Sequence, residues 1–100
     1  MPYKTFSAQG DYTDPVQITG RFNVEVLTDP AGSTVQLQKS LNGATGTYYL
    51  CYGDTTKAEY TAQCGELVEN FGQAYFRLYC NIYGGTPFYA GISSGNTLGT

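Results

Sequence analysis

Apolar residues recur at every second position through much of this chain, and this period of two limits its fold more than any other feature. The pattern is clearest over residues 22–26, 35–38 and 75–82. A strand with such alternation buries one face and exposes the other, and the Val, Phe, Tyr and Ile of these segments favour a pleated surface. We therefore predict an all-β fold around one core. The predicted core residues are Phe22, Val24, Val26, Val35, Leu37, Phe76, Leu78, Cys80 and Ile82.

Turn-forming residues divide the chain at short intervals. They are Asp14-Pro15, Asp29-Pro30-Ala31-Gly32, Asn42-Gly43, Gly53-Asp54, Gly84-Gly85 and Thr86-Pro87. The strands expected between them are 3–8, 16–27, 33–41, 47–52, 56–64, 73–83 and 87–92. About seven short antiparallel strands with turns every ~8–12 residues are typical of a single small β-sandwich, of the immunoglobulin, fibronectin type III or jelly-roll kind. A barrel remains open as the alternative.

Two segments interrupt the regular pattern of strands and turns. Gly20 interrupts the second expected strand, and we predict a bulge or bend there. Residues 65–71 are short and have Gly on both sides, so we predict a loop or one helical turn that crosses between sheets. The 100 residues are expected to form one domain, with 1–15 as a possible N-terminal arm and 93–100 as a polar C-terminal tail.

The side-chain inventory excludes several classes of function. The chain contains no His and no Trp, so His-based catalytic triads and His general bases are excluded. Its formal net charge is −3, which argues against nucleic acid as a partner because such binders need a positive surface. No run approaches the ~20 apolar residues of a membrane helix. The first residues lack the apolar segment of a signal peptide, so we expect folding in a cytosol and no secretion by such a peptide.

The cysteines and carboxylates predict neither catalysis nor a bound metal. Cys51, Cys64 and Cys80 form no CxxC motif, and an odd number without a signal peptide predicts free thiols, with one disulfide and a leftover thiol as the alternative. No His is present to activate a thiol nucleophile. Asp11 and Asp14 share a loop and offer oxygens to calcium, but two acids are too few, and capping of their own turns is the expected role. We predict a non-enzyme without catalytic, cofactor-binding or metal-binding residues.

The tyrosines supply the candidate interaction surface. The chain has 10 Tyr, and Tyr75, Tyr79 and Tyr83 recur on the face of one expected strand opposite the core, with Arg77 among them. Tyr combines a large ring with a polar tip, and Arg stacks on such rings, which suits contact with another protein. Two other interpretations remain open: half-buried rings with no binding role, and a platform for a glycan.

Three segments carry a resemblance to a known family. They are 20–26 (GRFNVEV), 34–43 (TVQLQKSLNG) and 74–85 (AYFRLYCNIYGG). In this order they resemble the strand, hairpin and strand motifs of small β-sandwich proteins encoded by tailed bacteriophages and prophages. The chain departs from that family at Lys39, where Arg is usual, at Asn42, where Asp is usual, and at Tyr48 and Tyr49, where a Trp is common.

The resemblance implies a structural role in a virion. Such a protein is a head decoration or cement protein, or a tail accessory protein, assembled in the host cytoplasm. It docks in many copies on the major capsid protein or another virion protein and forms a homo-oligomer. A carbohydrate-binding module for attachment to a host surface is the alternative, with a glycan as the partner.

Overall fold

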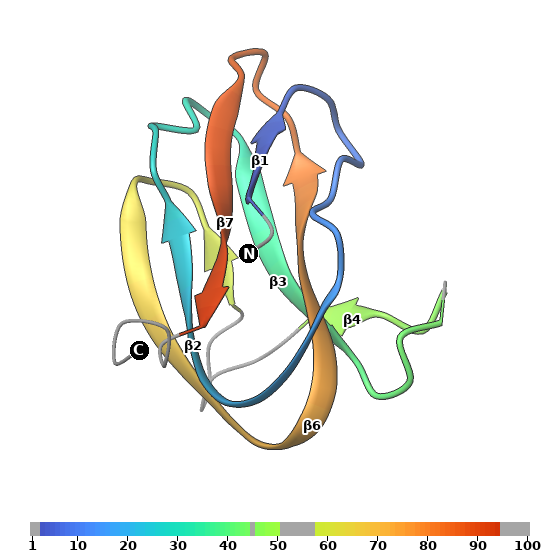
Figure 1. The fold of residues 1–100 in the computed structure, drawn as a ribbon. Coiled ribbons are helices and arrows are strands. Elements are labelled where there is room, and N and C mark those ends of the chain that lie inside the picture. Colours follow the sequence, from blue (N-terminus) through green and yellow to red (C-terminus); the bar gives the residue numbers. More distant parts are fainter. Residues whose placement is uncertain (1–2, 45, 51–57, 95–100) are drawn as a thin grey trace.

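The computed structural model describes residues 3–44, 46–50 and 58–94, and within them the fold is all β, with no helix (Figure 1). The strands are β1 (Tyr3–Phe6), β2 (Val16–Val26), β3 (Thr34–Ser40), β4 (Tyr49–Leu50), β5 (Glu59–Tyr60), β6 (Cys64–Ile82) and β7 (Phe88–Ser94). All seven pair antiparallel in one open sheet of order β1-β7-β2-β6-β3-β4, and β5 also pairs with β3. No helix that could cross a bilayer occurs in this described part of the chain.

β6 is the strand around which the sheet is organised. It is 19 residues long, and Figure 1 shows it as one strongly curved strand. β2 pairs with it from Val26 opposite Cys64 to Val16 opposite Phe76, and β3 pairs with its second half. The chain before β2 continues the ladder, because the Cys80 amide donates to the Asp11 carbonyl at 2.7 Å. Both edges of the second half of β6 are therefore hydrogen-bonded.

The first half of β6 corrects one prediction. Residues 65–71 form neither a loop nor a helical turn but lie within the strand. The reason is tertiary: the register sets Phe22 opposite Val68 and Asn23 opposite Leu67, so β2 supplies backbone partners that the segment lacks by itself. The predicted bulge at Gly20 is confirmed, since the register shifts between Thr19 and Gly20 and the Gly20 φ is +96°.

The core confirms the period of two and shows where it fails. Eight of the nine predicted core residues are at most 2% exposed. Ile82 is 49% exposed, so its assignment to the core was wrong. The physical reason is a second register shift, between Thr34 and Val35, which leaves Asn81 without a partner in β3. One extra residue reverses the alternation, and Tyr83 packs against the core instead.

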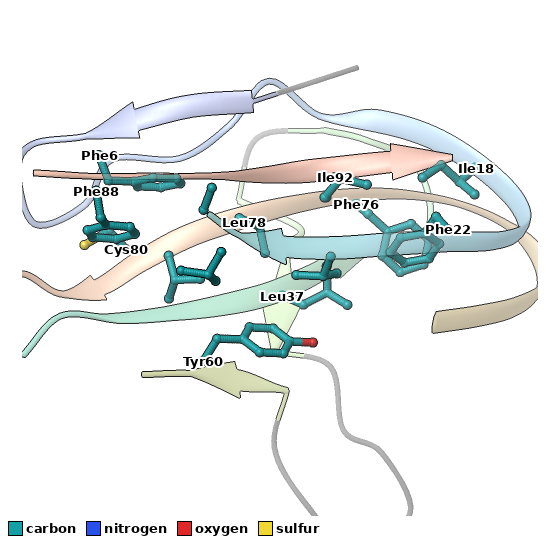
Figure 2. Close-up of a cluster of buried hydrophobic side chains, with 14 of the residues drawn as sticks. Phe6, Ile18, Phe22, Leu37, Tyr60, Phe76, Leu78, Cys80, Phe88 and Ile92 are labelled. Atoms are coloured by element: carbon teal, nitrogen blue, oxygen red, sulfur yellow. The ribbon is translucent and has the colours of Figure 1, made fainter. Parts of the chain in front are cut away.

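Strands from both ends of the chain complete the core (Figure 2). Phe6 of β1 and Phe88 of β7 are fully buried and stack with ring centroids 5.0 Å apart. Residues 3–6 of the possible N-terminal arm are thus a paired strand of the sheet. Of the expected tail, Ser93 and Ser94 end β7, while 95–100 lie outside the described residues. The further buried apolar residues are Ile18, Tyr60, Ala74, Ala90 and Ile92.

Strand boundaries near the middle of the chain differ from expectation. The segment expected at 47–52 contains β4, of two residues, and the one expected at 56–64 contains β5, also of two residues. The Gly53-Asp54 turn and Cys51 lie outside the described residues. Asn42-Gly43 does form a turn, with Gly43 at φ +78°, but eight residues rather than two separate β3 from β4.

The register shift near Asn81 predicts opposite responses at two similar residues of β6. Leu78→Ala removes a fully buried side chain and should lower the free energy of unfolding by about 2–5 kcal/mol. Ile82→Ala, the matched control, should change it by less than about 0.5 kcal/mol because the side chain is half exposed. Urea unfolding of both variants measures the difference. Equal losses would show that the alternation continues through Asn81.

The two cysteines that the structure describes should differ in the reactivity of their thiols. Cys64 and Cys80 are free thiols, Cys64 exposed and Cys80 fully buried. In a Cys51→Ser variant, a chromogenic thiol reagent should modify Cys64 in the folded protein and Cys80 only on unfolding. Denatured wild type, kept without reductant, should release three equivalents of chromophore. A count of one would mean that a disulfide has formed.

Candidate functional site

Arg77 is the centre of the candidate site, on the outward face of the second half of β6. Alternation along this strand sends Phe76 and Leu78 into the core and leaves Arg77 partly exposed on the other side. The guanidinium carbon lies 4.3 Å from the ring centroid of Tyr48, 4.4 Å from that of Tyr12 and 5.4 Å from that of Tyr79. Three rings thus hold one cation by cation–π contact, in what we call the Arg77 cluster: Tyr12, Tyr48, Arg77 and Tyr79.

The Arg77 cluster gathers residues from three separate parts of the chain. An isolated antiparallel bridge sets Tyr12 opposite Tyr79, and their rings stack at 6.5 Å. Thr13, next to Tyr12, fixes this segment: its backbone amide donates to the Leu78 carbonyl, and its hydroxyl accepts from the Leu78 amide. Tyr48 precedes β4 on the far side of β3. Tyr12 is 49% exposed, so the cluster presents an aromatic ring to solvent.

A row of hydrogen bonds runs from Arg77 across the neighbouring strands. Arg77 Nε donates to Gln38 Oε1 at 2.8 Å, and Gln38 Nε2 donates to Gln36 Oε1 at 3.3 Å. Gln36 Nε2 then donates to Glu59 Oε2 at 2.9 Å. We call these four residues the polar row. Each amide accepts on its Arg77 side and donates on its Glu59 side, so a cation stands at one end and an anion at the other.

The four residues predicted as an interaction stripe have three different surroundings. Arg77 and Tyr79 belong to the Arg77 cluster. Tyr75 lies beneath the turn after β3. Its ring is so close to Gly43 that a Cβ atom at that position would be 3.0 Å from it. Tyr83 does not lie on the same face as the other three, because the register shift at Asn81 turns its side chain toward the core. The stripe is thus shorter than the sequence predicts.

The turn that covers Tyr75 is held by its own polar side chains. Ser40, fully buried at the end of β3, accepts a hydrogen bond from the Gly43 amide at 3.0 Å. Asn42 Oδ1 accepts from the Ala44 amide at 2.9 Å and from the Thr47 hydroxyl at 3.0 Å. These bonds satisfy a tight turn locally, as Asn and Ser do in many loops. The turn is therefore a fixed border of the candidate surface.

The remaining titratable groups take structural roles. Asp11 accepts hydrogen bonds from the backbone amides of Ser7 and Ala8, and these bonds lower the pKa of its carboxyl. It caps a turn as expected, and Asp14 is exposed. Burial raises the pKa of the Cys80 thiol, and partial desolvation raises that of the exposed Cys64 thiol. Among the described residues no three Cys, Asp or Glu side chains gather as metal ligands would.

Sequence reasoning missed part of the site. Gln36 and Gln38 alternate with buried Val35 and Leu37, so their outward direction was readable from the period of two. Their connection to Arg77 was not, because it depends on which strand lies beside β3. Tyr12 gave no signal either, since it lies outside any alternating run. Comparisons with family models, with curated proteins and with solved structures find no match for this chain.

The Tyr48 hydroxyl predicts an effect of pH on stability. This buried oxygen has no hydrogen-bond partner among the described residues, and burial raises its pKa. The folded protein therefore holds the phenolic proton more tightly than the unfolded chain does. Its contribution to stability is fully present below about pH 10 and is lost as pH rises through the raised pKa. The free energy of unfolding of the wild type should fall in this alkaline range.

Two Tyr→Phe variants test that prediction. Tyr48→Phe should leave the free energy of unfolding at pH 7 unchanged or raised, because it removes a buried hydroxyl without a partner. This variant should also lose less of its free energy of unfolding as the pH rises through the alkaline range. Tyr60→Phe is the control: the Tyr60 hydroxyl donates to Glu66, and its removal should lower stability by about 1–3 kcal/mol. A destabilised Tyr48→Phe would show that the hydroxyl is hydrogen-bonded in solution.

Proposed function

We propose that this chain is a non-enzymatic structural component of a bacteriophage virion, a capsid decoration or cement protein that docks in many copies. The three motifs that resemble phage β-sandwich proteins support it. They fall on β2, on β3 with its following turn, and on the second half of β6. These strands are neighbours in the sheet, so the resemblance covers one connected unit and not scattered fragments.

The observation that carries the proposal is the Arg77 cluster. Tyr and Arg are the residue types in which protein interfaces concentrate their binding energy. Here they lie together on a sheet face, partly exposed and already held in place by stacking and by the Gln38 hydrogen bond. Groups that are ordered before binding lose little conformational entropy when a partner arrives.

We infer a two-layer β-sandwich of the immunoglobulin, fibronectin type III or jelly-roll kind. One layer consists of β1, β7, β2 and the first half of β6, and the other of the second half of β6 with β3, β4 and β5. The register shifts at Gly20 and Asn81 are the places where such a sheet bends. Phe22 and Phe76, with ring centroids 4.5 Å apart, lie in the inferred interior.

Docking in many copies also fits the size of the domain. A chain of 100 residues buries a modest core. Binding to an ordered lattice stabilises the folded state by mass action, by about 2.7 kcal/mol when the partner concentration is a hundred times the Kd. We place the protein on the particle, assembled in the host cytoplasm, with the major capsid protein or another virion protein as its partner. A tail-associated position is the variant of this proposal.

A carbohydrate-binding module is the second candidate. The exposed Tyr12 ring, stacked beside Tyr79, and the half-buried Gln36 amide are groups that contact sugars in other proteins. Against it, the rings are engaged with the Arg77 cation.

Sedimentation with particles tests the proposal. Particles of the encoding phage, produced without this chain, are mixed with purified protein and pelleted. Wild type should pellet with them. Arg77→Ala and Tyr79→Ala should each weaken binding by more than about 1 kcal/mol, roughly fivefold. Arg21→Ala, on the exposed face of β2, is the control and should bind as wild type does.

Three outcomes decide between the candidates. Wild type that stays in the supernatant but binds a glycan array supports the carbohydrate-binding module. Wild type that binds neither contradicts both candidates. If all three variants bind equally well, the assembly role stands and the contact surface lies elsewhere, for example at the open edge of β1 or of the first half of β6.

A further inference from the structure

Both ends of the polar row have hydrogen-bonding groups that the described residues do not use: N–H donors at Arg77 and carboxylate oxygens at Glu59. Of the five N–H donors of Arg77, only Nε has an acceptor among the described residues, the Gln38 Oε1 atom. No carboxylate in the described residues forms an ion pair with Arg77. At the other end, Glu59 accepts one hydrogen bond from the described residues, from Gln36 to Oε2. Within the described residues, one end is therefore a cation without a carboxylate partner and with spare donors, and the other is an anion with spare acceptor sites.

The two ends are held at a fixed separation. Arg77 lies on β6, the two glutamines on β3 and Glu59 on β5, and the register sets Gln38 opposite Arg77 and Gln36 opposite Glu59. Adjacent strands are ~4.8 Å apart, so two strand spacings separate the two residues by about 10 Å across the strands, and the offset from Gln38 to Gln36 adds about 7 Å along them. At that distance the two groups do not neutralise each other directly. The face keeps a positive end and a negative end.

Such a face is complementary to itself. Consider a two-fold axis that lies in the plane of the face, midway between the two charges and at right angles to the line that joins them. Rotation about this axis lays a second copy on the first and sets Arg77 of each copy opposite Glu59 of the other. An isologous contact of this kind forms both ion pairs at once. A partner that offered only an acidic group would use one end of the row and leave Glu59 without a cation.

We propose that the face of the polar row and the Arg77 cluster binds a second copy of this chain, in a two-fold dimer with reciprocal Arg77–Glu59 pairs. This inference rests on the proposed function and names the partner of the same surface: neighbouring copies in the assembly contact each other there. The aromatic rings beside Arg77 supply apolar area to the contact, and Tyr12, 49% exposed, is the ring with most to bury.

Charge reversal tests the reciprocal pairing. The full-length wild type should show a monomer–dimer equilibrium in sedimentation equilibrium, weakened by added salt. Arg77→Glu creates two Glu–Glu contacts in the dimer, and Glu59→Arg creates two Arg–Arg contacts. Each single variant should weaken dimerisation by at least about tenfold. Lys4→Glu, an equal charge change on the edge strand β1, should dimerise as the wild type does.

The two single variants then test each other. The Arg77→Glu variant has glutamate at both positions, and the Glu59→Arg variant has arginine at both. In an equimolar mixture, two Glu–Arg pairs can form between the two variants, so heterodimers should form although neither variant dimerises alone. The double variant Arg77→Glu/Glu59→Arg should regain the homodimer. Because a misfolded variant could not be rescued by mixing, this arm separates lost pairing from lost folding. Cooperative urea unfolding of each variant provides the same check.

Several results would overturn the inference. It fails if the wild type is monomeric throughout the concentration series, if the single variants dimerise as the wild type does, or if neither mixing nor the double change restores the dimer. The proposed function is tested apart from it. Wild type that pellets with particles but never dimerises contradicts only this inference. Wild type that dimerises but does not pellet with particles contradicts only the virion role.

Discussion

Backbone hydrogen bonding along both edges of β6 is the interaction on which the other features of this molecule depend. This strand pairs with β2, with β3 and with residues 10–13, so elements far apart in the sequence share one ladder. Alternation along the same strand sends Leu78 into the core and Arg77 to the opposite face. The core and the candidate surface are therefore two sides of one strand, and a slip in its register would exchange them.

The two register shifts give the sheet its shape and limit the surface. At Gly20 the left-handed backbone lets β2 continue along β6 beyond the bulge. At Asn81 the extra residue turns Ile82 outward and Tyr83 inward, which ends the row of outward rings at Tyr79. A bulge is thus what separates the rings that can meet a partner from the ring that packs against the core.

The surface itself joins two kinds of interaction. Cation–π contacts hold Arg77 among its rings, and a directed row of amides connects it to Glu59 on β5. The first favours contact with apolar and aromatic groups, and the second places opposite charges at a fixed spacing. Together they fix the positions of the rings and of the two charges, and the proposed contact between copies rests on this arrangement.

The sequence by itself determined the β class, the bulge at Gly20 and eight residues of the core, because a period of two is a local property that any pairing partner must respect. It also placed Arg77 and Tyr79 on the outward face. Only the tertiary structure decided that 65–71 extends β6, that Asn81 reverses the alternation, and that Tyr12 and Glu59 join the site. Those features depend on which strands become neighbours and in which register. Such pairing is set by long-range packing, which no local pattern contains.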